Sequence, residues 1–163
     1  MPRETEVALF REGLPEPPGG VLTGGTASRD ELVRRFVHAL ERRDTAGVRA
    51  LVLTRAEFAY LYYPTNPEAQ PPYDLSPALM WFMLDGNSRK GIERAFDRRG
   101  GSPLEYVGYS CEAAPSRQGA NTVWAPCVVR RLQSPGDTVS ERLFGPIVDR
   151  DGRFKFVSYA NKL

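Results

Sequence analysis

Histidine and cysteine, the side chains on which most metal sites and many catalytic sites depend, are scarce in this sequence. The 163 residues include a single histidine, His38, and two cysteines. Structural zinc sites take four ligands, chiefly Cys and His, so we expect no metal site. Asp149 and Asp151 belong to the turn sequence DRDG, which accounts for both acids without a ligand role. The stretch GGVLTGG lacks the Lys-Ser/Thr pair that a phosphate-binding loop requires, and we expect no cofactor.

A strong net charge and a long apolar run are also missing. Twenty-two basic residues against 20 acidic ones give a net charge of +2, too small to draw the chain strongly to nucleic acid or acidic lipid. The longest apolar run, Ala78 to Leu84, is far shorter than the roughly 18 to 20 residues that cross a bilayer. We expect no nucleic-acid partner and no transmembrane segment. The first ten residues do not have the pattern of a signal peptide, so the protein is either cytosolic or exported with its signal absent from this sequence.

Proline and glycine are unevenly distributed and divide the chain in two. Pro15, Pro17 and Pro18 are followed by two glycine pairs before residue 26, a composition that disfavours both helices and strands. We predict an extended arm over residues 1–25. The rest, residues 26–163, has the length of a single domain with one core.

Helical periodicity begins directly after this arm. Ser28 starts a capping-box sequence, and apolar residues then recur at helical spacing as far as Asp44, which predicts a helix. His38 falls on the opposite, arginine-rich face and is expected to face water. Pro77 begins another helix whose stretch LMWFML is apolar on every side, which predicts burial all round, and Gly86-Asn87 is expected to interrupt it.

The second half of the sequence predicts strands. Segments rich in Val, Phe, Tyr and Trp lie at about 103–112, 121–133, 138–148 and 153–160, separated by turn residues. Helices first and hairpin-linked strands afterwards predict an α+β fold, with N-terminal helices packed on a C-terminal antiparallel sheet of about four strands. The proline-rich segment 64–72 is expected to be a surface loop and a candidate contact surface for a protein partner.

The two cysteines fall at positions that can face one another. If the strands at 103–112 and 121–133 form a hairpin that turns near Gln118, opposed residues have numbers that sum to about 237 to 238. Cys111 and Cys127 sum to 238, so a cross-strand disulfide is feasible. Such bonds persist in oxidising compartments, which favours an extracytoplasmic protein over a cytoplasmic one. The alternative is a pair of reduced, buried cysteines that pack as small apolar residues.

Two stretches resemble the nuclear transport factor 2-like superfamily. LVRRFVHALERRDTAGVRAL is similar to its opening helices, and DRDGRFKFVSYAN looks like its last hairpin. The resemblance covers residues 26–163 and implies a curved sheet wrapped against three helices, a cone with an apolar cavity. Members include ketosteroid isomerases, polyketide cyclases, epoxide hydrolases, dehydratases and non-catalytic binding modules, so the fold does not settle the function. The resemblance also implies that two copies can pair through the sheet as a homodimer.

The catalytic residues of the isomerase branch have no counterpart at the matching positions. That branch uses an Asp base with an oxyanion hole made by a Tyr and a protonated Asp. Phe36 stands where the resemblance places the tyrosine, and Tyr63 stands where it places the base. Asp85, which follows the apolar run LMWFML, is the remaining weak candidate for a base. The ordinary alternative is an aspartate that ends a helix segment.

Aromatic side chains are the strongest candidates for lining the implied cavity. Two interpretations stand: packing of the core and sheet, and a pocket for a flat apolar ligand oriented by tyrosine hydroxyls. The pocket candidates are Tyr60, Tyr63, Trp81, Tyr106, Trp124 and Tyr159, with Tyr62 and Tyr109 in the same aromatic set.

The function predicted from these features is non-catalytic binding of a small apolar or aromatic molecule or of a partner protein through a cone-shaped pocket. The alternative is a lyase or isomerase that uses Asp85 and a pocket tyrosine as base and acid.

Overall fold

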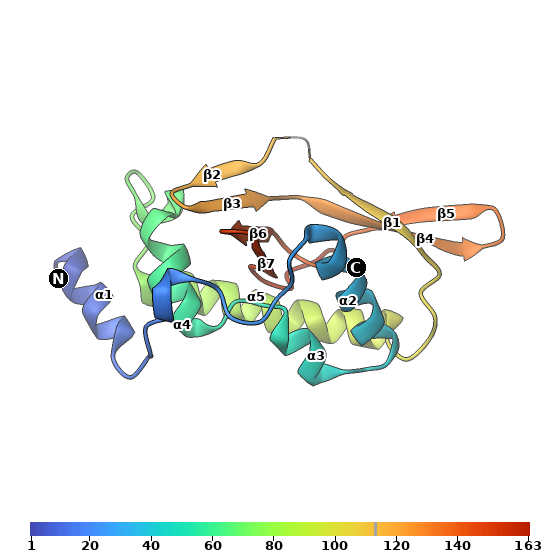
Figure 1. Ribbon diagram of the computed structural model, residues 1–163, viewed down its shortest axis with the longest axis horizontal. Helices are drawn as coiled ribbons and strands as arrows, with labels where there is room; N and C mark the ends of the chain where they lie inside the picture. Colours follow the sequence, from blue (N-terminus) through green and yellow to red (C-terminus); the bar gives the residue numbers. More distant parts are fainter. Residues whose placement is uncertain (113) are drawn as a thin grey trace.

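The computed structural model describes residues 1–112 and 114–163 and places helices first and strands second along the chain (Figure 1). The α-helices are α1 (Arg3–Arg11), α2 (Arg29–Glu41), α3 (Thr45–Ala50), α4 (Arg55–Glu57) and α5 (Pro77–Arg99). Short helical turns are η1 (Pro18–Gly20), η2 (Phe58–Tyr62), η3 (Tyr63–Thr65) and η4 (Pro67–Ala69). The strands are β1 (Tyr106–Cys111), β2 (Ser116–Gln118), β3 (Asn121–Trp124), β4 (Cys127–Ser134), β5 (Asp137–Glu141), β6 (Ile147–Arg150) and β7 (Arg153–Phe156). All strand pairings are antiparallel, which confirms the predicted α+β class.

The strands form two sheets rather than the single sheet of about four strands that the sequence predicts. One sheet has the order β1-β4-β5 and the other β2-β3-β6-β7. The predicted strand 121–133 divides into β3 and β4 at Ala125 and Pro126, where proline has no backbone N–H for the ladder. The predicted strand 138–148 divides in the same way between β5 and β6. The residues between them include Leu143 and Phe144, which are buried in the core.

Cys111 and Cys127 lie opposite each other in the β1–β4 pair and form a disulfide with an S–S distance of 2.07 Å. Their neighbours Tyr109 and Val129 are paired in the same register. The sequence prediction of this register and of the disulfide is confirmed.

Helix α2 has the start and the orientation that its sequence indicates, but it ends at Glu41 rather than near Asp44, which instead caps α3. The Ser28 hydroxyl accepts a hydrogen bond of 3.1 Å from the backbone N–H of Glu31 and so caps the first turn. Leu32, Phe36 and Leu40 are fully buried. His38 is exposed, as its place on the helix predicts.

Helix α5 differs from its predicted form in two respects. It runs without a break through Gly86 and Asn87 as a helix of 23 residues, because a glycine in a helix interior costs only about 1 kcal/mol, which packing offsets. The stretch LMWFML is not buried all round: Phe82 is 76% exposed and Leu79 47%. Only one face of this stretch meets the protein, through the buried Met80 and the partly buried Trp81 and Leu84.

The prediction of an extended arm is wrong for the first residues of the chain. Arg3–Arg11 forms helix α1, because this stretch has no proline or glycine of its own and carries an apolar side through Val7 and Phe10. Phe10 is 7% exposed and packs edge-on against Phe58, with ring centroids 5.8 Å apart. The prolines and glycines that suggested an extended arm lie further along, after α1 has ended.

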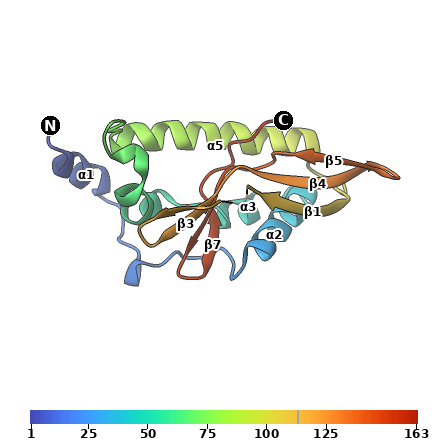
Figure 2. The same cartoon turned by 90° about the horizontal axis from the view of Figure 1, so that it is seen from above.

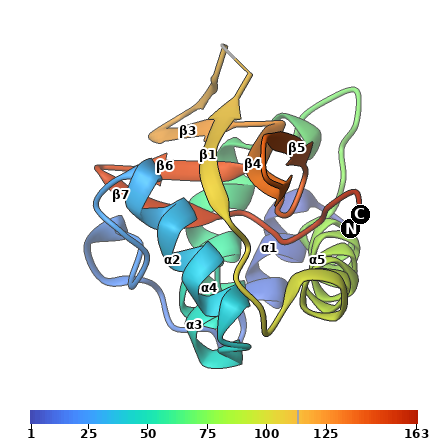
Figure 3. The same ribbon diagram turned by 90° about the vertical axis from the view of Figure 1, so that its right-hand side faces the viewer.

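The helices and sheets are arranged around two hydrophobic clusters. Helix α5 runs along one side of the domain, α1 lies at one end, and the β4–β5 hairpin extends at the other end (Figures 1 and 2). Seen end-on, α2 and α3 lie below the strands and beside α5 (Figure 3). One cluster contains Phe36, Phe144 and Phe156, and the other contains Phe58 and Met80. Within the described parts of the chain, no helix is long and apolar enough to cross a membrane.

Candidate functional site

The interior between α2 and the sheets is filled by aromatic rings. The centroid of the Phe36 ring lies 5.4 Å from those of Phe144, Phe156 and Tyr159. All four side chains are 3% exposed or less. At the place where the resemblance puts an apolar cavity, these rings pack at the separations usual for aromatic pairs in a core.

The predicted pocket aromatics are shared between the two hydrophobic clusters and do not meet in one pocket. Tyr60, Tyr63 and Trp81 belong with the cluster around Phe58. Tyr106, Trp124 and Tyr159 belong with the cluster around Phe36.

Arginine side chains cover two of these aromatics. The Arg11 guanidinium carbon lies 4.5 Å from the ring centroid of Tyr60, and that of Arg29 lies 4.7 Å from the ring centroid of Trp124. At these separations a cation over a ring face is attracted by the ring quadrupole. One face of the Tyr60 ring and one face of the Trp124 ring are therefore each covered by an arginine.

Tyr63 has a similar structural role, in the same cluster as Tyr60 and also against helix α1. Its hydroxyl donates a hydrogen bond of 2.7 Å to the Leu75 carbonyl and contacts the Arg3 guanidinium. Arg3 also donates to the Leu75 carbonyl, at 2.6 Å. Burial raises the pKa of Tyr63 above its usual value, although the Arg3 charge opposes this effect. Tyr63 thus joins α1 to the end of the loop that precedes α5.

A groove between α3 and α5, here the α3–α5 groove, has a volume of about 710 Å³. The half-buried side chains of Val52, Ile92 and Phe96 form its apolar part. Charged residues surround them. The lining side chains that carry charge are Arg49, Asp85, Arg89, Glu93 and Asp97. The groove therefore combines an apolar floor with a polar rim, as ligand sites commonly do.

Two sequence-predicted residues, Asp85 and Tyr159, both line the α3–α5 groove. Asp85 Oδ2 lies 2.7 Å from Arg89 Nη2, one turn further along the helix. The Tyr159 hydroxyl donates to the Val48 carbonyl, and burial raises its pKa well above the usual value. Both groups are therefore engaged within the protein, and the phenol of Tyr159 keeps its proton at neutral pH.

The groove owes part of its shape to a glycine that sequence reasoning did not single out. The C-terminal segment crosses α5 at Gly91, where an added Cβ would lie 1.7 Å from the Tyr159 carbonyl oxygen. Ser88 holds the same crossing, because its hydroxyl accepts a hydrogen bond of 2.9 Å from the Tyr159 N–H. No local sequence pattern predicts a contact between segments about 70 residues apart.

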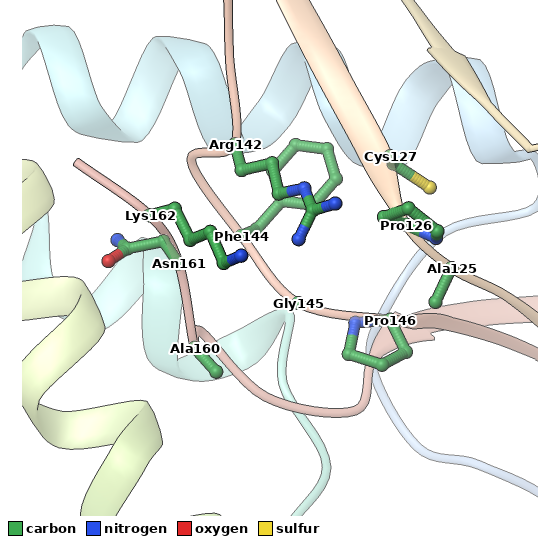
Figure 4. A pocket seen from close by; sticks show the side chains of 10 residues that line it. All are labelled: Ala125, Pro126, Cys127, Arg142, Phe144, Gly145, Pro146, Ala160, Asn161 and Lys162. Carbon is green, nitrogen blue, oxygen red and sulfur yellow. The ribbon is translucent and has the colours of Figure 1, made fainter.

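A second hollow, here the Arg142 pocket, lies beside the disulfide and has a volume of about 250 Å³ (Figure 4). Two of its lining residues, Arg142 and Lys162, are cationic and come from two segments that meet in an isolated antiparallel bridge. Most of the other lining residues have apolar side chains or, at Gly145, no side chain. They are Ala125, Pro126, Cys127, Phe144, Gly145, Pro146 and Ala160, with Asn161. No sequence pattern predicts this pocket, because Arg142 and Lys162 are brought together only by the bridge.

In the part of the chain that the structure describes, no three His, Cys, Asp or Glu side chains lie together as a set of metal ligands. Comparison of the chain with known protein families, with curated proteins and with solved structures found no match. The features of the chain that bear on its function are therefore its hollows and the residues that line them.

Proposed function

We propose that this chain is a non-catalytic binding domain of nuclear transport factor 2-like architecture, and that a small molecule with an apolar body binds in the α3–α5 groove. The observation that carries the proposal is a groove of about 710 Å³ whose floor is apolar. This volume lies within the roughly 300 to 1,000 Å³ typical of sites for small molecules. Val52, Ile92 and Phe96 are half-buried, so a ligand that covers them removes further apolar surface from water.

The state of Asp85 and Tyr159 favours binding over catalysis. A general base must reach the proton that it removes, and a general acid must have a proton to give. Asp85 is paired with Arg89 at 2.7 Å, and the Tyr159 proton is donated to the Val48 carbonyl. Each group already has a partner within the protein, which favours binding over proton transfer to a bound molecule.

A titration with the neutral fluorescent probe N-phenyl-1-naphthylamine tests the binding site. We expect saturable binding to the unaltered chain and at least ten-fold weaker binding to Ile92→Trp, because the larger side chain occupies the groove. Leu79→Trp is the matched control, since Leu79 lies on the same helix, is 47% exposed and does not line the groove. Equal binding by Ile92→Trp and the unaltered chain, or no binding by either, would overturn the proposal.

The second candidate is a lyase or isomerase, which one observation favours: Asp85 and Tyr159 line the same groove. Asp85→Asn separates the two candidates. If the protein is a binding module, Asp85→Asn keeps the affinity for the neutral probe and there is no enzymatic activity for it to lose. As an enzyme it loses turnover of its substrate by several orders of magnitude, as is usual when a general base is removed.

We also propose that the protein works in an oxidising, extracytoplasmic compartment. Support comes from the disulfide between Cys111 and Cys127, because such bonds are rare where thiols are kept reduced. Maleimide added to the intact producing cells before lysis tests this. We expect both cysteines to escape labelling until a reductant is added. Labelling of both thiols without reductant would contradict the proposed location.

A further inference from the structure

We propose that the Arg142 pocket is a second binding site, separate from the α3–α5 groove, and that it takes a small aromatic carboxylate. Arg142 and Lys162 supply the positive charge, and the rings of Pro126, Phe144 and Pro146 supply apolar walls. Figure 4 shows the cationic ends of both side chains directed towards the hollow, with the prolines on its other side.

The positions of Arg142 and Lys162 are fixed by the backbone. The two residues are partners in an isolated antiparallel bridge, with a hydrogen bond of 3.2 Å from the Lys162 N–H to the Arg142 carbonyl. Directly opposed residues of an antiparallel pair project to the same side. Both cations therefore face one ligand position.

Within the described residues, no carboxylate forms an ion pair with either cation. The adjacent acid, Glu141, is bound by Arg99 and Arg131. The neighbouring Asn161 offers them no acceptor either. Its amide N–H groups donate to the carbonyls of Gly91 and Leu143, and its amide oxygen accepts a hydrogen bond of 3.2 Å from Arg94 Nε.

The half-buried Arg142 guanidinium has the geometry for a carboxylate in particular. It carries five N–H donors in a planar fork that matches the two oxygens of a carboxylate. No side-chain hydrogen bond occupies these donors in the part of the chain that the structure describes, and Arg142 is only partly open to solvent. A charge-assisted bond there is screened less than one on an open surface.

The size and lining of the pocket select the rest of the ligand. A volume of about 250 Å³ is slightly below the range of sites for drug-sized molecules, so it suits a single ring with a carboxylate. An inorganic anion would satisfy the cations but would leave the faces of Pro126, Phe144 and Pro146 uncovered. The apolar walls therefore favour an organic acid over free phosphate.

Isothermal titration with benzoate, with neutral benzamide and with inorganic phosphate tests this assignment. We expect saturable binding of benzoate and at least ten-fold weaker binding of benzamide and of phosphate. Arg142→Gln should weaken benzoate binding at least ten-fold, and Lys162→Gln several-fold. Arg153→Gln, which removes an exposed arginine outside the pocket, is the matched control and should bind benzoate as the unaltered chain does.

Further variants keep the outcome clear. If Arg142→Gln fails to fold, Ala160→Trp, which fills the pocket, should abolish benzoate binding. Ile92→Trp, which fills the α3–α5 groove, should leave it unchanged, so that failure of one site does not imply failure of the other. Equal affinity for benzoate and benzamide, unchanged binding by Arg142→Gln, phosphate binding as tight as that of benzoate, or no benzoate binding would overturn the proposal.

Discussion

The ammonium of Lys155 lies 2.7 Å from Glu57 Oε1, and both side chains are only 2% exposed. Lys155 also donates a hydrogen bond of 2.9 Å to the Thr23 carbonyl, and Glu57 Oε2 accepts one of 2.8 Å from the Thr23 N–H. Glu57 closes the capping box of α4 through the Thr54 N–H. This ion pair therefore joins strand β7, helix α4 and the segment that precedes α2.

Removal of one partner of this ion pair should be strongly destabilising. Lys155→Met leaves the Glu57 carboxylate buried without its cation, which typically costs 3 to 5 kcal/mol. We expect the free energy of unfolding, measured by urea denaturation, to fall by about this amount. The double variant Lys155→Met with Glu57→Gln should lose less than the sum of the two single changes, because no unpaired charge remains. Strict additivity would show that the two groups do not interact.

The Glu141 carboxylate should make stability depend on pH in the acid range. Burial alone would raise its pKa, but hydrogen bonds and charges from Arg99 and Arg131 lower it from 4.5 to about 2. A carboxyl whose pKa is lower in the folded state contributes its full stability above pH 4.5, and this contribution is lost as the pH falls towards 2. Allowing for solvent screening, we expect a loss of about 1 to 2 kcal/mol between these values.

Glu141→Gln isolates this contribution. The variant should be less stable than the unaltered chain at pH 7, and the difference should shrink as the pH falls towards 2. Urea denaturation at several pH values measures it. A constant difference across the whole range would show that the ion pair does not stabilise the fold.

The disulfide should contribute about 3 kcal/mol. Cys111 and Cys127 are 16 residues apart. Closing a loop of that length lowers the conformational entropy of the unfolded chain, which stabilises the folded state by roughly this free energy. The double variant Cys111→Ser with Cys127→Ser should unfold at a correspondingly lower urea concentration, and mass spectrometry should show the unaltered chain about 2 Da lighter than its reduced form by stoichiometry. Reduction should destabilise the unaltered chain but leave the double variant unaffected.

Two glycines of the same helix should respond in opposite directions to the same substitution. Gly86→Ala should stabilise α5 by up to about 1 kcal/mol, because nothing lies within 4 Å of an added Cβ and alanine favours helix. Gly91→Ala should destabilise the protein, because the added Cβ would collide with the Tyr159 carbonyl at 1.7 Å. Thermal unfolding of both variants measures the contrast. Equal effects at both positions would mean that the C-terminal segment does not cross the helix at Gly91.

Local patterns in the sequence determined much of the fold. The capping residues and periodicity of α2 predicted its start, its buried side and the exposure of His38. The turn residues predicted the hairpins, and the numbering sum predicted the pairing of Cys111 with Cys127. Each of these features depends on residues close in sequence or on the period of one strand pair, so the sequence alone carries the information.

Contacts between distant segments were decided only by the tertiary structure. The burial of one side of α5 depends on what packs there, which is why the apolar Phe82 is exposed although its neighbour Met80 is buried. The predicted pocket aromatics lie in two clusters, because the tertiary fold and not the sequence spacing decides which side chains each ring packs against. The two hollows arise where α3 meets α5 and where residue 142 meets residue 162. Composition and residue spacing do not predict such contacts. The free energy gained when distant segments pack together depends on the complete arrangement of the chain.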